Sequence, residues 1–165
     1  MAESTIVKTK RDGTLTIYDN GRSNSYTVSF EAGDFSLSIP GRQANVFPDR
    51  GVFGATPSVR WGDDQPMTGS FTAYLRDGND AAVAALINIL TETGWWASNA
   101  VSTLGTNAEV KTWELLYTFE GTDHGDAADH TIAVDHCALT GSVTEGDPSV
   151  LSISFTAFQL YPTVA

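Results

Sequence analysis

The sequence predicts a mainly β fold, an antiparallel β-sandwich or partly closed barrel with one flanking α-helix at about residues 80–93. Short segments alternate apolar and polar residues with the period of two that a half-buried strand requires. Clusters of Gly, Pro, Asn and Asp separate these segments, and a single segment changes to the helical period. A chain of 165 residues without an internal repeat then fits a single domain, residues 1–165.

The first third of the chain contains three predicted strands, at residues 14–18, 26–30 and 35–39. In the third of them, Phe35, Leu37 and Ile39 face one side, while Ser36 and Ser38 face the other. Asp-Asn-Gly follows the first strand and Pro-Gly follows the third, and these residues favour turns.

Residues 41–58 are expected to form a long loop. They contain three glycines, two prolines and two arginines, and they show no helical period. Apolar residues such as Phe47 and Phe53 are uncommon in solvated tails, so the loop should pack on something. Both another chain and the protein's own core fit this pattern.

Residues 59–75 begin as a strand, pass through a polar Gly-Asp-Asp turn and resume as a second strand at residue 67. In this second strand Phe71, Ala73 and Leu75 share one side, and Ser70 and Thr72 lie on the other.

The predicted helix follows directly. Asn79 or Asp80 can cap its first turn. Its apolar stripe consists of Val83, Leu86, Ile87 and Leu90, and Gly94 is expected to end it in the left-handed conformation.

Three more strands complete the predicted fold, at residues 110–119, 132–143 and 150–158. Trp113 and Leu115 are in phase in the first of these strands. In the last, Leu151, Ile153 and Phe155 face inward, and Ser152, Ser154 and Thr156 face outward.

The composition narrows the range of functions that the chain could have. A formal net charge of −11 disfavours direct phosphate binding, which relies on Lys and Arg. The sequence contains no apolar run of membrane-spanning length, and its first residues show no secretory signal. The single cysteine, Cys137, excludes an intrachain disulfide, fits a reducing compartment and is expected to be a small buried residue.

No catalytic or metal site is predicted, and no cofactor. His124, His130 and His136 are six residues apart, which is too far along a strand for one metal ion. The acid pairs Asp63-Asp64 and Glu145 with Asp147 occur in turns, where they are solvated and point in different directions.

The tryptophans support an alternative function, a carbohydrate-binding β-sandwich module. Sugar-binding sandwiches use exposed aromatic platforms, and Trp61, Trp95 and Trp96 are candidates. Trp113 is in phase with core residues and is expected to be buried, and core packing suits most of the four.

The polar strand faces are small, neutral and rich in hydroxyls. A solvated sheet face would ordinarily carry more Lys and Glu. The pattern fits either a solvated face or a sheet that lines a wet passage. The residues concerned are Ser36, Ser38, Ser70, Thr72, Ser152, Ser154 and Thr156.

Short sequence motifs occur in a fixed order along nearly the whole chain. They lie at residues 11–16, 26–28, 31–37, 59–66, 68–71, 110–112, 135–137 and 145–149. They include Arg-Asp-Gly-Thr-Leu-Thr at 11–16 and Glu-Gly-Asp-Pro-Ser at 145–149. In this order and spacing the chain resembles the major tail tube protein of long-tailed (siphovirus-type) bacteriophages.

The resemblance implies a structural virion protein without catalytic activity that self-assembles into hexameric rings. The rings stack into the phage tail tube, and DNA passes through its lumen during ejection without specific binding. The implied partners are other copies of the chain, a tape-measure protein and tail terminator proteins, with no membrane. The protein would be assembled in the host bacterial cytoplasm and reside in the virion tail.

The resemblance also implies roles for individual residues. The loop at 41–58 and the N-terminal arm at 1–12 would tie one ring to the next. The implied contact residues are Lys8, Lys10, Arg11, Arg42, Phe47, Arg50 and Phe53. The hydroxyl residues named above would face the lumen.

Overall fold

The computed structural model describes residues 13–19, 22, 24–28, 35–47, 58–74, 81–93, 101–102, 110–122, 125 and 127–165. These ranges contain, in chain order, β1 (Gly13–Tyr18), β2 (Ser25–Val28), β3 (Ser36–Ser38), β4 (Arg42–Phe47), β5 (Ser58–Asp64), β6 (Met67–Tyr74), α1 (Ala81–Thr91), β7 (Val101–Ser102), β8 (Lys111–Phe119), β9 (His130–Thr144), β10 (Val150–Ala157) and β11 (Thr163–Val164). The predicted fold class is confirmed: the protein is mainly β, antiparallel and sandwich-like, with one helix among the described residues. Its main sheet is open and does not close into a barrel.

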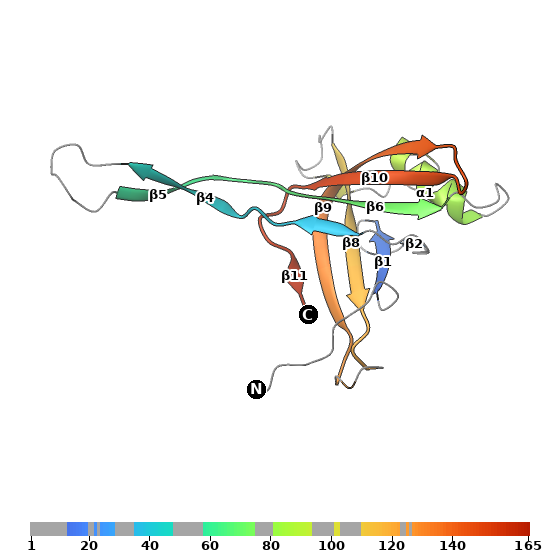
Figure 1. The fold of residues 1–165 in the computed structure, drawn as a ribbon, viewed down its shortest axis with the longest axis horizontal. Helices are drawn as coiled ribbons and strands as arrows, with labels where there is room; N and C mark the ends of the chain where they lie inside the picture. The colour runs from blue at the N-terminus through green and yellow to red at the C-terminus, as the bar shows by residue number, and fades with distance from the viewer. Residues whose placement is uncertain are drawn as a thin grey trace.

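The main sheet has the strand order β2-β1-β8-β9-β10-β6-β3, with β11 beside β9 and β7 beside β8. Figure 1 shows β8 and the first part of β9 running across the direction of β6 and β10. The strand β9 belongs to both halves, so the two halves form one folded sheet with the core between them.

A β-bulge in β9 makes this change of direction. Between the pairs Trp113 with Cys137 and Leu115 with Val134, the single residue Glu114 faces two residues of β9. One of these is His136, which has a positive φ of 56°. A bulge bends its strand and increases the local twist. Before the bulge, β9 pairs with β8 and β11, and after it β9 pairs with β10.

The C-terminal segment covers the edge of β9 that β10 leaves free. The amide of Phe158 donates to the His136 carbonyl at 3.1 Å, and the Asp135 amide donates to the Gln159 side-chain oxygen at 2.8 Å. Further along, Thr131 and Ala165 exchange two backbone hydrogen bonds. The Gln159 side chain thus supplies an acceptor at a bulge, where an ordinary ladder partner is missing.

The core lies between the two halves of the folded sheet and confirms the predicted inward residues of β8 and β10. Trp113 and Leu115 are buried, as are Leu151, Ile153 and Phe155. Phe35 stacks on Tyr117 of β8 with ring centroids 4.9 Å apart and links the halves. Ile39, predicted to face inward with Phe35, lies beyond the end of β3 and is 48% exposed.

The helix α1 contacts β2 and β9, as a helix that covers a sheet should. Among its described side chains, Leu86 and Ile89 are buried and Leu90 packs partly buried against the core, whereas Ile87, which the predicted stripe also included, is 38% exposed. The stripe is therefore rotated from the predicted one, because the sheet surface and not periodicity alone decides which face is covered. Val83, Asn79, Asp80 and Gly94 lie outside the residues whose side chains or placement the structure describes.

Glu92 ends the helix with a positive φ of 55°, and its amide donates to the Ile89 carbonyl at 3.3 Å. The left-handed end, predicted at Gly94, thus occurs already at Glu92. The Glu92 carboxylate also lies 3.3 Å from the Lys111 ammonium group, an ion pair that joins the helix end to β8.

Cys137 is fully buried, as predicted, and burial raises the pKa of its thiol. The folded state therefore keeps the proton when the unfolded chain loses it above about pH 8.5. This thiol therefore contributes to the free energy of unfolding below about pH 8.5, and the contribution is lost as the pH rises further.

We expect the free energy of unfolding to fall above pH 8.5 by up to about 1.4 kcal/mol per pH unit from this group alone. Urea unfolding of the protein and of Cys137→Ala at pH 7 and pH 10 measures the effect. The Cys137→Ala variant should lose less stability between the two pH values, and equal losses would contradict the assignment.

The segment at 41–58, predicted to be a loop, contains a strand. Residues 42–47 form β4, which pairs with β5 in a separate two-stranded sheet. The polar sequence at 62–64 is not a turn, since β5 runs through it to Asp64. Figure 1 shows this hairpin, hereafter the arm (residues 42–47 and 58–64), projecting from the body in line with β6.

Candidate functional surfaces

The first candidate surface is a hydroxyl face on four neighbouring strands, β9, β10, β6 and β3. Strand register places its residues in three rows that cross the strands. The rows are Ser142-Ser152-Thr72, Thr140-Ser154-Ser70-Ser36, and Thr156-Thr68-Ser38. Strands lie about 4.8 Å apart and alternate residues about 6.7 Å apart, so the hydroxyls form a regular grid.

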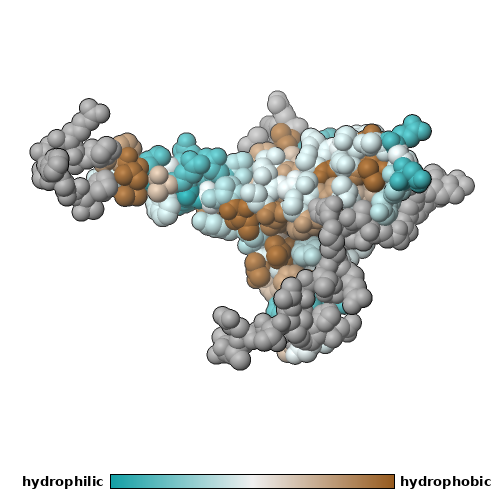
Figure 2. All heavy atoms as spheres, viewed as in Figure 1, coloured by the Kyte–Doolittle hydropathy of each residue, from teal (hydrophilic) through white to brown (hydrophobic). Residues whose placement is uncertain are grey.

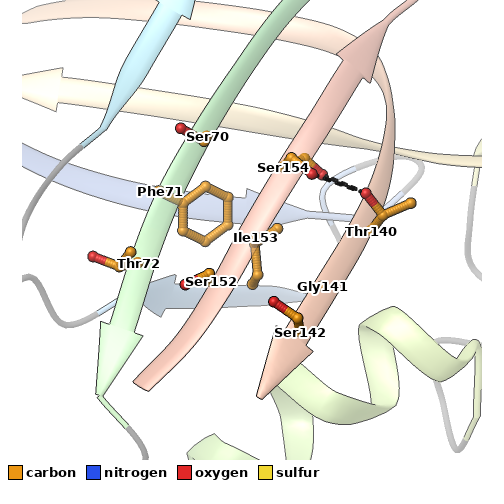
Figure 3. A pocket seen from close by; sticks show the side chains of 9 residues that line it. All are labelled: Ser70, Phe71, Thr72, Thr140, Gly141, Ser142, Ser152, Ile153 and Ser154. Atoms are coloured by element: carbon orange, nitrogen blue, oxygen red, sulfur yellow. Dashed lines mark hydrogen bonds between the residues drawn. The ribbon is translucent and has the colours of Figure 1, made fainter. Parts of the chain in front are cut away.

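Hydrogen bonds between neighbouring hydroxyls hold the middle row together. The hydroxyls of Ser36 and Ser70 are 3.0 Å apart, and those of Thr140 and Ser154 are also 3.0 Å apart. Figure 3 shows the second pair joined across β9 and β10. Either oxygen of each pair can donate, so these side chains satisfy each other while remaining accessible to water.

Around these rows the surface is hollowed into an open depression of about 450 Å³. The lining side chains are hydroxyls with two core residues, Phe71 and Ile153, beneath them, and none is charged. Figure 3 shows that they come from three adjacent strands, β6, β9 and β10. Among the described residues, the acids close to these hydroxyls along the chain lie at strand ends. They are Glu145 and Asp147 in the turn after β9, and Asp63 and Asp64 at the end of β5.

All seven hydroxyl residues singled out from the sequence lie on this one face. Three members were missed, Thr68, Thr140 and Ser142. Their signal was present, because Thr140 and Ser142 alternate with apolar residues in the predicted strand at 132–143. Only the register of β9 against β10 shows that they join the same rows.

We expect the hydroxyl face to matter little for folding. Replacing Ser154 by Ala removes one exposed hydroxyl pair, so the free energy of unfolding should change by less than about 1 kcal/mol. Urea denaturation tests this value, with Ile153→Ala as the matched core change in the same strand, expected to cost about 2–5 kcal/mol. Comparable losses in both variants would show that the hydroxyl face does contribute to folding stability.

The second candidate surface is the arm. The outer part of one of its sides is apolar, because the register pairs Ala44 with Trp61 and Val46 with Val59. Trp61 is 70% exposed, and Val46 and Val59 are similarly uncovered. Figure 2 shows hydrophobic residues gathered on the outer part of the arm. Isolated chains seldom leave so continuous an apolar strip in water unless it contacts a partner.

The opposite side of the arm carries Asn45, Phe47, Ser58 and Arg60. Phe47, Ser58 and Arg60 line a shallow depression of about 390 Å³. Arg60, which sequence reasoning did not single out, makes no ion pair with any described residue. At the base of the arm, by contrast, the Arg42 Nε lies 2.6 Å from the Asp64 carboxylate.

These findings locate two of the predicted contact residues. Phe47 is exposed near the end of β4. Arg42, expected to pair with acids on a neighbour, instead pairs with Asp64 across its own hairpin. Lys8, Lys10, Arg11, Arg50 and Phe53 lie outside the described residues, as does the N-terminal arm at 1–12.

The remaining candidates are the histidines and the tryptophans. No group of metal-ligating side chains occurs among the described residues. His130 lies against Phe119, His136 sits at the bulge, and His124 is outside the described ranges. Trp113 is buried, as predicted, and Trp61 stands exposed on the arm; Trp95 and Trp96 are not described.

The loop between β8 and β9 is closed by Asp129, whose carboxylate accepts hydrogen bonds from the Gly121 amide and from the amide and hydroxyl of Thr122. These donors hold the pKa of the Asp129 carboxyl below its usual range. The Asp129 carboxylate therefore holds the two ends of this loop together. Among the helices in the described ranges, none has the length and apolar character needed to cross a membrane.

Comparison with known proteins identifies the fold. No protein-family profile matches the chain, and no curated protein matches it. A chain of the sheath/tube terminator structure of an extracellular contractile injection system (PVC) superposes with a TM-score of 0.55 at 13% identity, covering 100% of this chain and 99% of that one. A chain of the anti-feeding prophage baseplate superposes with a TM-score of 0.58 at 7% identity, covering 99% of this chain and 97% of that one. A chain of the anti-feeding prophage tube-terminating cap superposes with a TM-score of 0.53 at 15% identity, covering 100% of this chain and 94% of that one. The chain therefore has a fold found in components of phage-tail-like particles.

Proposed function

We propose that this protein is a non-catalytic structural subunit of a phage-tail-like tube. Six copies form a ring, rings stack into the tube, and the hydroxyl face lines a lumen through which DNA passes. The observation that carries the proposal is the uncharged grid of hydroxyls on β9, β10, β6 and β3. The fold shared with tube-terminator and cap structures supports it.

The chemistry of the hydroxyl face suits a passage. A lining without Lys or Arg gives phosphates no cation to bind, so DNA does not adhere. The acidic charge of the chain as a whole adds a weak repulsion. The hydroxyls hold a layer of water at the wall by hydrogen bonds, which an apolar wall could not do.

Ring formation also solves a problem that the open sheet creates. Its last strand, β3, is only three residues long and covers β6 at residues 68–70. Open sheet edges invite uncontrolled pairing, and closure of six sheets into one barrel removes them. Head-to-tail stacking of such rings is heterologous and gives an open filament. Tape-measure and terminator proteins would set its length, and the assembled tube would reside in the tail of a virion.

A second candidate function is that of a tube terminator, which forms one ring and does not stack further. Two of the compared structures, a sheath/tube terminator and a tube-terminating cap, favour it, since each aligns over the whole of this chain. The two candidates predict different assemblies.

Negative-stain electron microscopy of the purified protein at high concentration, with light scattering, separates these candidates. Stacked hollow tubes support the tube subunit, and isolated six-fold rings support the terminator. A protein that stays monomeric at all concentrations would overturn both assignments. A glycan panel read by tryptophan fluorescence would then test the carbohydrate-binding alternative.

The lumen assignment has its own test. Ser154→Cys places a reactive thiol on the hydroxyl face, whereas Ala128→Cys places one in an exposed loop away from it. Cys137 is buried and stays unlabelled. After labelling of the rings with a small gold cluster, we expect Ser154→Cys to give density on the axis and Ala128→Cys to give it at another radius. Peripheral density from Ser154→Cys would contradict a lumenal hydroxyl face.

A further inference from the structure

The arm and an acidic turn lie at opposite ends of the same two strands. Met67, at the arm end of β6, pairs with Ala157, and Tyr74, at the far end, pairs with Val150. Residues 145–149, which connect β9 to β10, are therefore at the end remote from the arm. Figure 1 shows the arm continuing the line of β6 and β10 away from this turn. A second copy placed ahead along this line would bring its turn to the first copy's arm.

The arm differs in charge from the rest of the chain. Residues 42–64 contain Arg42, Arg50 and Arg60 against Asp49, Asp63 and Asp64, a formal charge of zero. Since the whole chain carries −11, the remainder carries all of this charge. Contact between two acidic bodies is disfavoured by like charge, whereas an arm without net charge that carries Arg60 can approach an acidic surface.

The turn offers a complementary surface. Glu145 and Asp147 are exposed and make no ion pair with a described residue. Beside them, Val143 is 60% exposed. Two hydrogen bonds between Ser149 and the backbone of Gly146, each 3.2 Å long, hold the turn in shape. An apolar residue next to two acids matches the side of the arm that carries Phe47 and Arg60.

We propose that the arm of one copy docks on the β9–β10 turn of the next, with Arg60 against Glu145 and Asp147 and Phe47, on the same side of the arm, against Val143. The contact rests on the proposed tube function, for which it supplies the link between successive copies. It joins two different surfaces, so it repeats without closing and generates a filament.

Disulfide trapping tests the contact directly. Arg60→Cys and Asp147→Cys are prepared as separate single variants, and the native Cys137 is buried in both. Mixed and mildly oxidised, they should give a disulfide-linked pair that contains one copy of each variant. The matched control mixes Arg60→Cys with Ala128→Cys, in an exposed loop away from the turn. Equal yields from the two mixtures would overturn the proposal.

Charge reversal gives an independent readout. Arg60→Glu should weaken association by about tenfold or more, because it faces two acids on the partner. The variant Glu145→Lys with Asp147→Lys should weaken it similarly, and a mixture of the two variants should associate with each other. The absence of such rescue, when each variant melts like the native protein, would overturn the pairing.

The two levels of the proposal fail in different ways. If the native protein forms tubes while trapping and reversal have no specific effect, the docking contact is wrong and the tube function stands. If native protein forms no tube but the arm-to-turn disulfide forms specifically, the docking contact stands and the tube function fails.

Discussion

Removing the arm should abolish tube formation without unfolding the protein. Deletion of residues 42–64, which joins Gly41 directly to Gln65, should leave a folded chain that forms no stacked tubes. The join is short because Arg42 and Asp64 are register partners at the base of the arm, and Ser38 pairs with Thr68 just beyond it. The β4 and β5 strands contact mainly each other, so the body should lose less than about 1 kcal/mol of unfolding free energy.

Urea denaturation and electron microscopy of the same sample measure the two effects. A milder variant, Val59→Ser with Trp61→Ser, keeps the arm but makes its apolar strip polar, and it should also reduce stacking. A folded deletion variant that still makes full-length tubes would remove the arm from the assembly mechanism.

Substituting Gly69 should be among the most damaging single changes to the fold. A Cβ at this position would lie 2.2 Å from the Ser36 carbonyl oxygen and 2.4 Å from the Phe155 ring. The first obstacle is backbone of the edge strand β3, and the second is a buried ring, so neither gives way easily. Gly69→Ala should lower the free energy of unfolding by about 3 kcal/mol.

Gly62 in the arm is the matched control. A Cβ there meets the flexible Asn45 amide group at 3.0 Å, and that side chain can move aside. Gly62→Ala should therefore cost less than about 1 kcal/mol in urea unfolding. Similar losses for the two glycines would show that β3 is not held against β6 as described.

The regular parts of the fold followed from the sequence because their stabilising pattern is local. Alternation at residues 150–158 placed Leu151, Ile153 and Phe155 inside, and these residues are buried. Trp113 was correctly expected in the core on the same grounds, and Cys137 because a free cysteine behaves as a small apolar residue. The hydroxyl residues of β3, β6 and β10 were likewise recognised, since each lies opposite apolar residues of its own strand.

The arm was harder to predict because its strands do not pack against a core of their own chain. Residues 42–47 are exposed throughout, so no alternation of burial marks them as a strand. Gly62, Asp63 and Asp64 resemble a turn, yet pairing with β4 keeps them extended. The free Arg60 was overlooked for a related reason, since only the pairing of Arg42 with Asp64 distinguishes the two arginines.

The sequence by itself determined the inward residues of β8 and β10, which strand faces carry hydroxyls, and that the chain is acidic and mainly β. These properties depend on the side chains and the period of a strand. The tertiary structure alone decided that β9 bends at His136, that four hydroxyl faces become one surface, and that the arm and the acidic turn occupy opposite ends of it. Register and sheet folding arise from contacts between residues far apart in the chain, which no local pattern records.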